Sequence, residues 1–559
     1  MFARTLKVTK DNQVYEYLKV VENIREHGKT RQKTLVNFGN VTQWPADKLQ
    51  RLIELLAAFI DMPLGSVTAS PLEDIDISAR RILGPFLPLA QIWAQLGLDQ
   101  ILTKALLDSH QDTRLVNSIK ALVFTQIISP RSKLSAHQYV ADHTEIPGIA
   151  GDALPLHCYY HALNALAATH IPIEKALHHP MQDLFNRDLS LVFYDLTSSY
   201  FEGKHCKLAK YGYSRDHRPD LVQIEIGLLV DNNGVPIGHD VFEGNLKDMA
   251  TVLNALDRLQ KDFSVKRCVF IGDDGMASEG NLAELTAHGY EYITSLSLGK
   301  STLGQQLLSA APPRAHWQEL HDLSCALHPF PEVTETPGIQ YVGTYIADRA
   351  ASTRAKRSKH LRECLTFLGE LQAPSKRRPS AQSGNARLLR ADRFLRRKFC
   401  VRYFTLSLTE AHQIRYVLNR DVLRQARRTD GILILKSDST TLNTEEIIRG
   451  YRSLWMVEDA FRHLKDPLHL RPIRHWNDSR VLGHIFVCVL AFTLERLYDL
   501  ALENNHLHIT ARKAFEQLSN IETVLLEAHG KSLRKRSKIS ADQQKLLAAV
   551  GIKEVALIW

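Results

Sequence analysis

Three features are missing from this 559-residue sequence, and each absence excludes a class of protein. The seven cysteines include no CxxC pair, so neither a disulfide framework nor a zinc site is indicated, and a reducing cytoplasm fits. The first residues, MFARTLKVTKDNQ, hold no apolar core like that of a signal peptide. The longest apolar run, Ile485–Leu494, is too short to span a bilayer and predicts a buried helix. We therefore expect a cytoplasmic protein with no membrane partner.

The composition is that of a large, basic, globular protein. Apolar residues make up 44% and charged residues 23% of a chain that is too long for one ordinary core, so several domains are expected. The net charge of +9 favours a polyanionic partner. Much of this charge is concentrated, because Arg349–Cys400 holds fifteen Lys and Arg against three Asp and Glu, a local charge of +12. Such density favours contact with phosphates over a merely solvated face.

The stretch Asn443–Pro467 predicts one helix, with a capping-box pair at its start and a proline at its end. Inside it, Tyr451, Glu458 and Lys465 recur every seven residues and therefore share one stripe, beside Arg462. An aromatic ring, a carboxylate and two cations in a row suit a nucleic-acid strand and a metal ion. The alternative is a solvated face with a Glu458–Arg462 ion pair.

From Ser190 onward the pattern predicts strand, strand, strand, helix, strand, helix, strand, with the second and third strands joined at Asn232–Gly234. Three antiparallel strands followed by parallel crossover units are similar to the ribonuclease H-like plan. In that plan, acids sit at the end of the first strand, at the end of the fourth and on a late helix. Asp195, Asp273 and Glu458 occupy these three positions.

Three carboxylates on separate elements suit phosphodiester chemistry, which needs an activated oxygen nucleophile and charge relief on the leaving oxygen. Two Mg²⁺ or Mn²⁺ ions about 4 Å apart supply both, and such hard cations prefer oxygen ligands. Each acid alone has a simpler explanation: Asp195 caps a turn over Thr197–Ser199, and Asp273-Asp274-Gly275 is an ordinary turn. Asp274 competes with Asp273, which is preferred because it lies closer to the apolar strand CVFIG.

The whole chain is expected to be an α+β or α/β multidomain protein, with helices on both faces of a ribonuclease H-like mixed sheet. We read 77–188 as helical from its periodicity, and we read the last 50 residues as helical too. The helical region before the sheet either reads DNA through a helix or is structural. The predicted regions are 1–64, small and β-rich, with a short helix over Ala46–Ile60; 65–188, helical and DNA-binding; 189–300, the first part of the core; 301–442, a basic β-containing insertion with a linker at Ser375–Gly384; 443–500, the second part of the core with the Glu helix; and 501–559, basic and helical.

Several blocks in the right order resemble the DDE transposases of bacterial insertion sequences, over about residues 80 to 500. YDLTSSYFEG matches the strand of the first Asp, GYSRDHRPDLVQIEIGLLVDNNGVPI matches the segment between the acids, and GDDGM matches the second Asp. YRSLWMVEDAFRHLK matches the third block with Tyr451, Glu458 and Lys465 in register. This block resembles the insertion-sequence-four-like subgroup, whose third acid sits in a Tyr-Arg-Glu-Lys motif. The family's Arg falls at Leu454, so Arg452 or Arg462 is expected to take over its phosphate contact.

The resemblance implies a transposase that cleaves DNA at the ends of its element and joins them to a target by strand transfer. Asp195, Asp273 and Glu458 would be the catalytic and metal-binding triad, holding Mg²⁺ or Mn²⁺, as two ions. Tyr451, Arg452, Arg462 and Lys465 would contact DNA, and the partners would be terminal inverted repeats, target DNA and a second copy in a synaptic dimer.

Some members of the family that this chain resembles flip a base out of the DNA and stack it on an aromatic residue. Tyr451 or Trp455 could accept such a base, although a core position is expected for Trp455. Two alternatives remain open: a catalytically inactive DNA-binding regulator derived from a transposase, motivated by the missing Arg, and a ribonuclease H-like nuclease that only hydrolyses.

Overall fold

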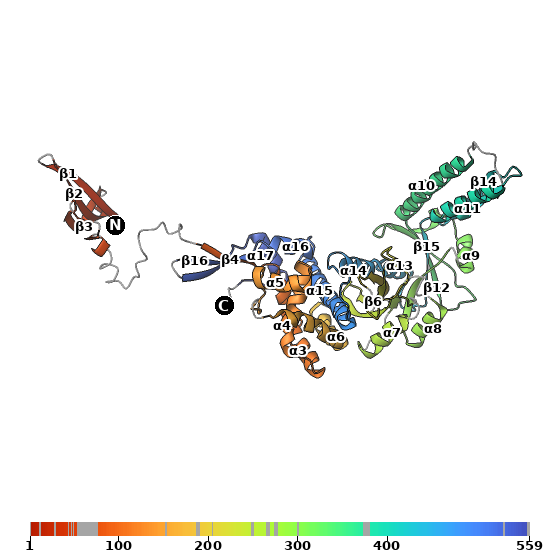
Figure 1. Ribbon diagram of the computed structural model, residues 1–559, viewed down its shortest axis with the longest axis horizontal. Helices are drawn as coiled ribbons and strands as arrows, with labels where there is room; N and C mark the ends of the chain where they lie inside the picture. Colours follow the sequence, from red (N-terminus) through yellow and green to blue (C-terminus); the bar gives the residue numbers. More distant parts are fainter. Residues whose placement is uncertain are drawn as a thin grey trace. The chain divides into compact units, whose positions relative to one another are not determined.

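The computed structural model forms two compact units, which are described separately here (Figure 1). One unit is Met1–Ala79 with Leu525–Arg534, and the other is Arg80–Val524 with Lys535–Trp559. The structure describes residues 2–555 except 11–12, 27–28, 43, 46, 49, 53–75, 151–153, 186–190, 204, 247–250, 264–268, 273–277, 299–300, 373–380 and 529–530.

The N-terminal residues form a three-stranded antiparallel sheet, in the order β1-β2-β3, as their alternating pattern predicted. Most of the helix predicted over Ala46–Ile60 lies outside the described residues. A second small sheet, in the order β17-β16-β4, corrects two helical predictions, because 76–82 and 531–536 are strands. Both segments are short and carry alternating polar residues, which suits edge strands. The strands are β1 (Phe2–Lys10), β2 (Gln13–Glu26), β3 (Lys29–Asn40), β4 (Asp76–Ile82), β16 (Glu522–Ala528) and β17 (Lys531–Arg536).

A helical layer in the larger unit packs around α15 (Asp478–Asn504), which contacts α2, α4, α6 and α16. The run Ile485–Leu494 is buried inside this helix, as predicted. Among the described residues, no helix is both long and apolar enough to cross a membrane. The other helices of this part are α2 (Phe86–Gln95), α3 (Leu98–Asp108), α4 (Val116–Ile128), α5 (Lys133–His143), α6 (Leu156–Phe185), α16 (Ala511–Leu518) and α17 (Ala541–Ala548).

A mixed sheet of nine described strands forms the centre of the larger unit, in the order β10-β11-β12-β15-β9-β8-β5-β6-β7. Strands β5, β6 and β7 pair antiparallel, whereas β8 pairs parallel with both β5 and β9, so the predicted order of elements is confirmed. These elements are β5 (Leu191–Tyr200), β6 (Gln223–Asp231), β7 (Pro236–Glu243), α7 (Thr251–Lys261), β8 (Val269–Ile271), α8 (Glu279–Ala287) and β9 (Glu291–Leu296).

Both faces of this sheet are covered, which explains why β6 is buried along its whole length. Alternate residues of each strand belong to two different cores. Phe193 of β5 packs in the core that contains α14 and α15, whereas Val192 and Tyr194 pack in the core that contains α7 and α8. Asp195, two residues after Phe193, therefore belongs to the face that α14 covers.

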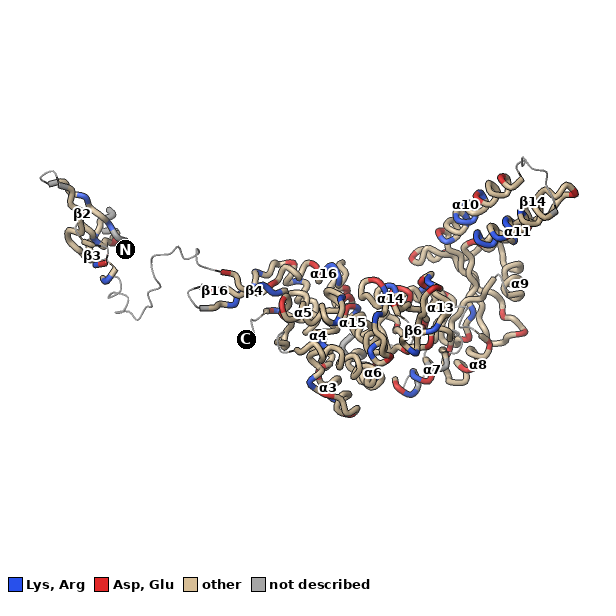
Figure 2. The backbone as a smooth tube through the Cα atoms, viewed as in Figure 1, with Lys and Arg blue, Asp and Glu red and all other residues tan. Residues whose placement is uncertain are grey.

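Residues 301–442 divide into two parts. Strands β10, β11, β12 and β15 extend the central sheet beyond β9, whereas α10, α11, β13, β14 and α12 pack around a core of their own. Lys and Arg recur along α10 and α11 (Figure 2). Part of the predicted linker is wrong, because α11 begins at Ala381; the rest lies outside the described residues. The elements are α9 (Thr302–Ala310), β10 (Gln318–Leu320), β11 (Cys325–Pro329), β12 (Gln340–Tyr345), α10 (Ala347–Gln372), α11 (Ala381–Arg397), β13 (Phe404–Leu408), β14 (Ile414–Leu418), α12 (Arg420–Arg428) and β15 (Ile432–Ser437).

Candidate active site

The stretch predicted as one helix consists of two, α13 (Thr444–Arg452) and α14 (Trp455–Lys465). The capping box at Asn443 is present as predicted. The two helices are separated at Ser453 and Leu454, and the Ser453 hydroxyl donates to the Arg449 carbonyl at 3.0 Å. The backbone then tightens into bonds between residues three apart, such as Leu454 N to Tyr451 O at 3.1 Å.

The break separates the members of the predicted stripe. Glu458, Arg462 and Lys465 on α14 line one cavity of about 580 Å³ together with Asp195 of β5. Tyr451 lies on α13 instead and packs, half-buried, against the main core. The prediction of one stripe through Tyr451, Glu458 and Lys465 on a single helix is therefore wrong for the tyrosine.

Asp195 lies in the middle of β5, not at its end, and is half-buried. The strand continues through Thr197–Ser199, so the explanation of Asp195 as a turn cap is also wrong. One carboxylate oxygen, Oδ1, accepts a hydrogen bond from the Leu196 backbone N–H at 2.7 Å. Because α14 packs against β5, the carboxylate reaches the space between the strand and the helix.

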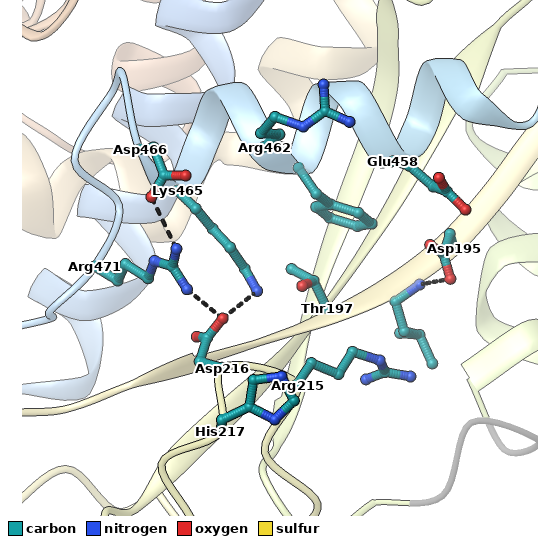
Figure 3. A pocket seen from close by; sticks show the side chains of 12 residues that line it. Asp195, Thr197, Arg215, Asp216, His217, Glu458, Arg462, Lys465, Asp466 and Arg471 are labelled. Carbon is teal, nitrogen blue, oxygen red and sulfur yellow. Dashed lines mark hydrogen bonds and ion pairs between the residues drawn. The ribbon is translucent and has the colours of Figure 1, made fainter. Parts of the chain in front are cut away.

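Glu458 is exposed in the first turn of α14, and the described residues give it no ion-pair or hydrogen-bond partner. The expected alternative, a pair with Arg462, is not formed. Arg462 Nη1 instead lies 2.8 Å from Asp459 Oδ1, and the arginine side chain is 67% exposed. Figure 3 shows the Glu458 and Asp195 carboxylates beside one another at one end of the cavity. Glu458, which has no cation partner among the described residues, thus faces the carboxylate of Asp195.

The other end of the cavity holds a buried carboxylate between two cations (Figure 3). Asp216, whose side chain is 3% exposed, pairs with Lys465 Nζ at 2.8 Å and with the Arg471 guanidinium. Burial lowers the pKa of Lys465, although Asp216 opposes this effect. Arg471 also pairs with Asp466 at 2.8 Å. Lys465 therefore lines the cavity with a charge that the protein already partly neutralises.

Sequence reasoning did not single out Arg215, Asp216 or Arg471. The first two lie in the loop before β6, where Arg215 pairs with the buried Glu225 of β6 at 2.6 Å and its N–H donates to Ser198 Oγ at 2.9 Å. One signal for Arg215 was available in the sequence. The apolar strand β6 carries Glu225, and a buried carboxylate needs a cationic partner.

Two further predicted DNA contacts lie elsewhere. Arg452 donates to the Leu323 carbonyl and does not line the cavity. Trp455 is 57% exposed, so the expected core position is wrong. Leu454, at the position of the family's Arg, is partly buried against the main core.

Asp273 and its competitor Asp274 lie outside the described residues. The described strand β8 ends at Ile271, which pairs with Phe193, and Phe193 precedes Asp195 by two residues. Within the described residues, no group of three His, Cys, Asp or Glu side chains forms a metal site. The carboxylates of Asp195 and Glu458 are nevertheless the oxygen donors that a hard divalent cation prefers.

Two family models match the chain. The transposase DDE domain matches residues 186–494, more than half of the chain, and the N-terminal domain of the IS1634 family transposases matches residues 4–61. The chain therefore belongs to the DDE transposases. It is a transposase of an insertion sequence, as its motifs predicted, and acts on DNA in a family that uses divalent metal ions.

The comparison with curated proteins gives no match. Among solved structures, six chains match. One is the piggyBac transposase in a synaptic complex with hairpin DNA, which is 8% identical over 73% of this chain and 71% of that chain, with a TM-score of 0.38.

Proposed function

We propose that the cavity between β5 and α14 is the catalytic centre for DNA end cleavage and strand transfer. Asp195 and Glu458 are two of its three carboxylates. The observation that carries the proposal is that two acids 263 positions apart in the sequence reach one cavity. Glu458 stays exposed there without a cation, although an arginine lies one turn further along the helix.

Asp273 is proposed as the third acid. Its support is the pairing of β8 beside β5, with Ile271 opposite Phe193, together with the match to the second block of the family. The strand order from β9 through β7 also supports a ribonuclease H-like core.

The carboxylates of this site would hold Mg²⁺ or Mn²⁺, as two ions. Bound there, the metal supplies an activated oxygen nucleophile and charge relief on the leaving oxygen. The protein's own contribution is positioning. Asp195 is fixed on a buried strand and Glu458 on a packed helix, so both oxygens are held on rigid elements.

The cations of the cavity would bind the DNA backbone. Arg462 is exposed at the rim and would contact a phosphate directly. Lys465 and Arg471 share Asp216, and Arg471 also pairs with Asp466, so two carboxylates balance the two cations. The N–H groups of Lys465 and Arg471 would hydrogen-bond a phosphate beside the acids, while the paired carboxylates hold both side chains in place.

The partners proposed are terminal inverted repeats and target DNA, bound by a dimer that brings two ends together. A cytoplasmic location fits this role. The +12 of Arg349–Cys400 supports additional backbone contacts from the insertion.

The test replaces each acid by its amide, Asp195→Asn, Asp273→Asn and Glu458→Gln. Cleavage and strand transfer should fall on the order of a thousandfold or more, because charge stabilisation worth several kcal/mol is lost. Binding of the same DNA should change little, since no phosphate contact is removed.

Glu445→Gln is the matched control. Glu445 lies on the neighbouring helix α13 and pairs with Arg449 at the surface, so this variant should cleave like the wild type. Full cleavage by Glu458→Gln or Asp195→Asn would remove that residue from the catalytic centre.

A further inference from the structure

A second cavity, of about 720 Å³, lies next to the catalytic cavity, and Arg471 lines both. Its wall comes from the start of α5, from α6 and from the segment that links α14 to α15. Five of the described lining residues are Lys or Arg, and none is Asp or Glu. The cations are Arg131, Lys133, Arg471, Arg474 and Arg480.

Two of these cations have carboxylate partners, Arg471 as described above and Arg474 with Glu202 at 3.2 Å. The described residues give Arg131, Lys133 and Arg480 no carboxylate partner. Arg131 stacks over the Tyr139 ring at 3.8 Å, and Arg480 lies 4.9 Å from the Tyr160 ring. Among the described residues, three positive charges around this cavity therefore have no carboxylate partner.

Lys133 is the most telling of these residues because it is only 5% exposed. Its Nζ lies 3.3 Å from His484 Nδ1, and burial lowers the pKa of Lys133 to about 8. Burial and the nearby Lys133 charge also lower the pKa of His484, so this imidazole is neutral at pH 7. Burying an ammonium group without a carboxylate is costly unless a ligand supplies the missing anion.

Two independent features favour an anion in the same place. The Nε of Arg480 is buried with no hydrogen-bond partner among the described residues. The helices α5 and α15 both begin at this cavity, where their cap residues Ser132 and Asn477 lie. A helix N-terminus carries a partial positive charge and favours negative groups.

We propose that the second cavity binds a backbone phosphate of the DNA strand that enters the catalytic cavity. The proposal rests on the proposed function for the identity of the strand. Trp476, which lines the cavity and is 66% exposed, offers a face on which a neighbouring unpaired base stacks. This ring favours a nucleotide over a free phosphate ion.

The first experiment measures the affinity for a double-stranded oligonucleotide of arbitrary sequence over a range of salt concentrations. Arg480→Gln should bind more weakly, and the slope of log affinity against log salt should become shallower by about 0.9, the value for one lost phosphate contact. Lys104→Gln removes an exposed charge on α3 that lines neither cavity, and its slope should equal that of the wild type. An unchanged slope and affinity for a folded Arg480→Gln would overturn the proposal.

The second experiment uses Lys133→Met, which removes the buried charge but keeps the length of the side chain. Its melting temperature without DNA should rise, while its affinity for the oligonucleotide falls. A purely structural lysine would give the opposite result, a lower melting temperature with unchanged affinity.

Inorganic phosphate separates the two sources of the anion. If it raises the melting temperature of the wild type but not of Lys133→Met, while both proteins bind DNA equally, the cavity binds a free phosphate and the DNA assignment is overturned. All of these experiments measure binding or thermal stability and do not depend on cleavage. If Asp195→Asn still cleaves DNA while Arg480→Gln loses a phosphate contact, the catalytic proposal fails and the second cavity stands.

Discussion

The two adjoining cavities differ in how the protein balances its own charges. In the catalytic cavity, Asp216 and Asp466 pair with Lys465 and Arg471, and the described residues give the Glu458 carboxylate no cation. In the second cavity the charges left without carboxylates are cations, with Lys133 buried among them. We infer from this difference that the charge without a partner among the described residues indicates the ligand, and we propose a metal cation for the first cavity and a phosphate for the second.

The segment between α14 and α15 connects the two cavities and is held in place by the central sheet. Its Ile473 N–H donates to the Tyr200 carbonyl at 3.1 Å, and the Glu202 N–H donates to the Ile473 carbonyl at 3.1 Å. Since Tyr200 ends β5, the strand that carries Asp195 also positions Arg471. This link would hold a phosphate bound in the second cavity at a fixed position relative to the acids of the catalytic cavity.

The largest effect on stability is expected from Asp216→Asn, which would make the first cavity resemble the second. Two largely buried cations then lose their shared carboxylate, so the free energy of unfolding should fall by about 3–5 kcal/mol. Urea unfolding measures this change. Sulfate should restore more stability to this variant than to the wild type, because an anion replaces the lost charge.

Asp220→Asn serves as the control for this comparison. Its pair with Arg218 is at the surface, with the aspartate side chain 60% exposed, so the loss of stability should be far smaller than for Asp216→Asn. Equal losses for the two variants would show that Asp216 has no special role in balancing the cavity.

The next effect is the pH dependence that Lys133 imposes. Its pKa in the folded protein is about 8 and its ordinary value is 10.5, so the folded state binds fewer protons between these values. Stability in the absence of DNA should therefore rise with pH from about 8 to 10.5, by on the order of 3 kcal/mol from this residue. Phosphate affinity should fall over the same range as the ammonium loses its proton.

The measurement is the difference between the wild type and Lys133→Met in unfolding free energy at pH 7, 8.5 and 10. Other groups titrate in this range, but they are common to both proteins and cancel. The predicted difference favours the variant at pH 7 and shrinks toward pH 10. A difference that stays constant would contradict the assignment of the shift to Lys133.

A smaller effect on DNA binding is expected from one of two exposed tryptophans, Trp476, and none from the other, Trp455. Trp476→Ala should weaken the binding of DNA with an unpaired overhang by about 1–3 kcal/mol, the contribution of one stacked base. Trp455→Ala should leave it unchanged, because Trp455 is about as exposed but lines neither cavity. Equal losses would place the stacking surface outside the second cavity.

The sequence predicted the parts of the fold and site that depend on local pattern. The order of elements from β5 to β9 follows from apolar runs and turns. The place of Asp195 and Glu458 in that order made them candidates, and the structure brings both side chains to one cavity. The break at Ser453 was missed, because a serine inside a helical pattern is compatible with either outcome. The break places Tyr451 on α13 and Glu458 on α14.

The second cavity could not be predicted from the sequence for a different reason. Lys133 and Arg480 are 347 positions apart and meet because α5 and α15 begin at the same place. No spacing or motif connects them. Likewise, Asp216 becomes a partner of Lys465 through a loop that bridges two elements distant in the chain.

The central claim is that Asp195, Asp273 and Glu458 share one metal site, and site-directed oxidation tests it most directly. Fe²⁺ is added in place of Mg²⁺, with ascorbate and peroxide, so that hydroxyl radicals cut the backbone near the bound metal. We predict cuts near all three residues, suppressed by excess Mg²⁺ and lost in Glu458→Gln but not in Glu445→Gln. Cuts confined to other segments, or cuts that persist in Glu458→Gln, would contradict the account.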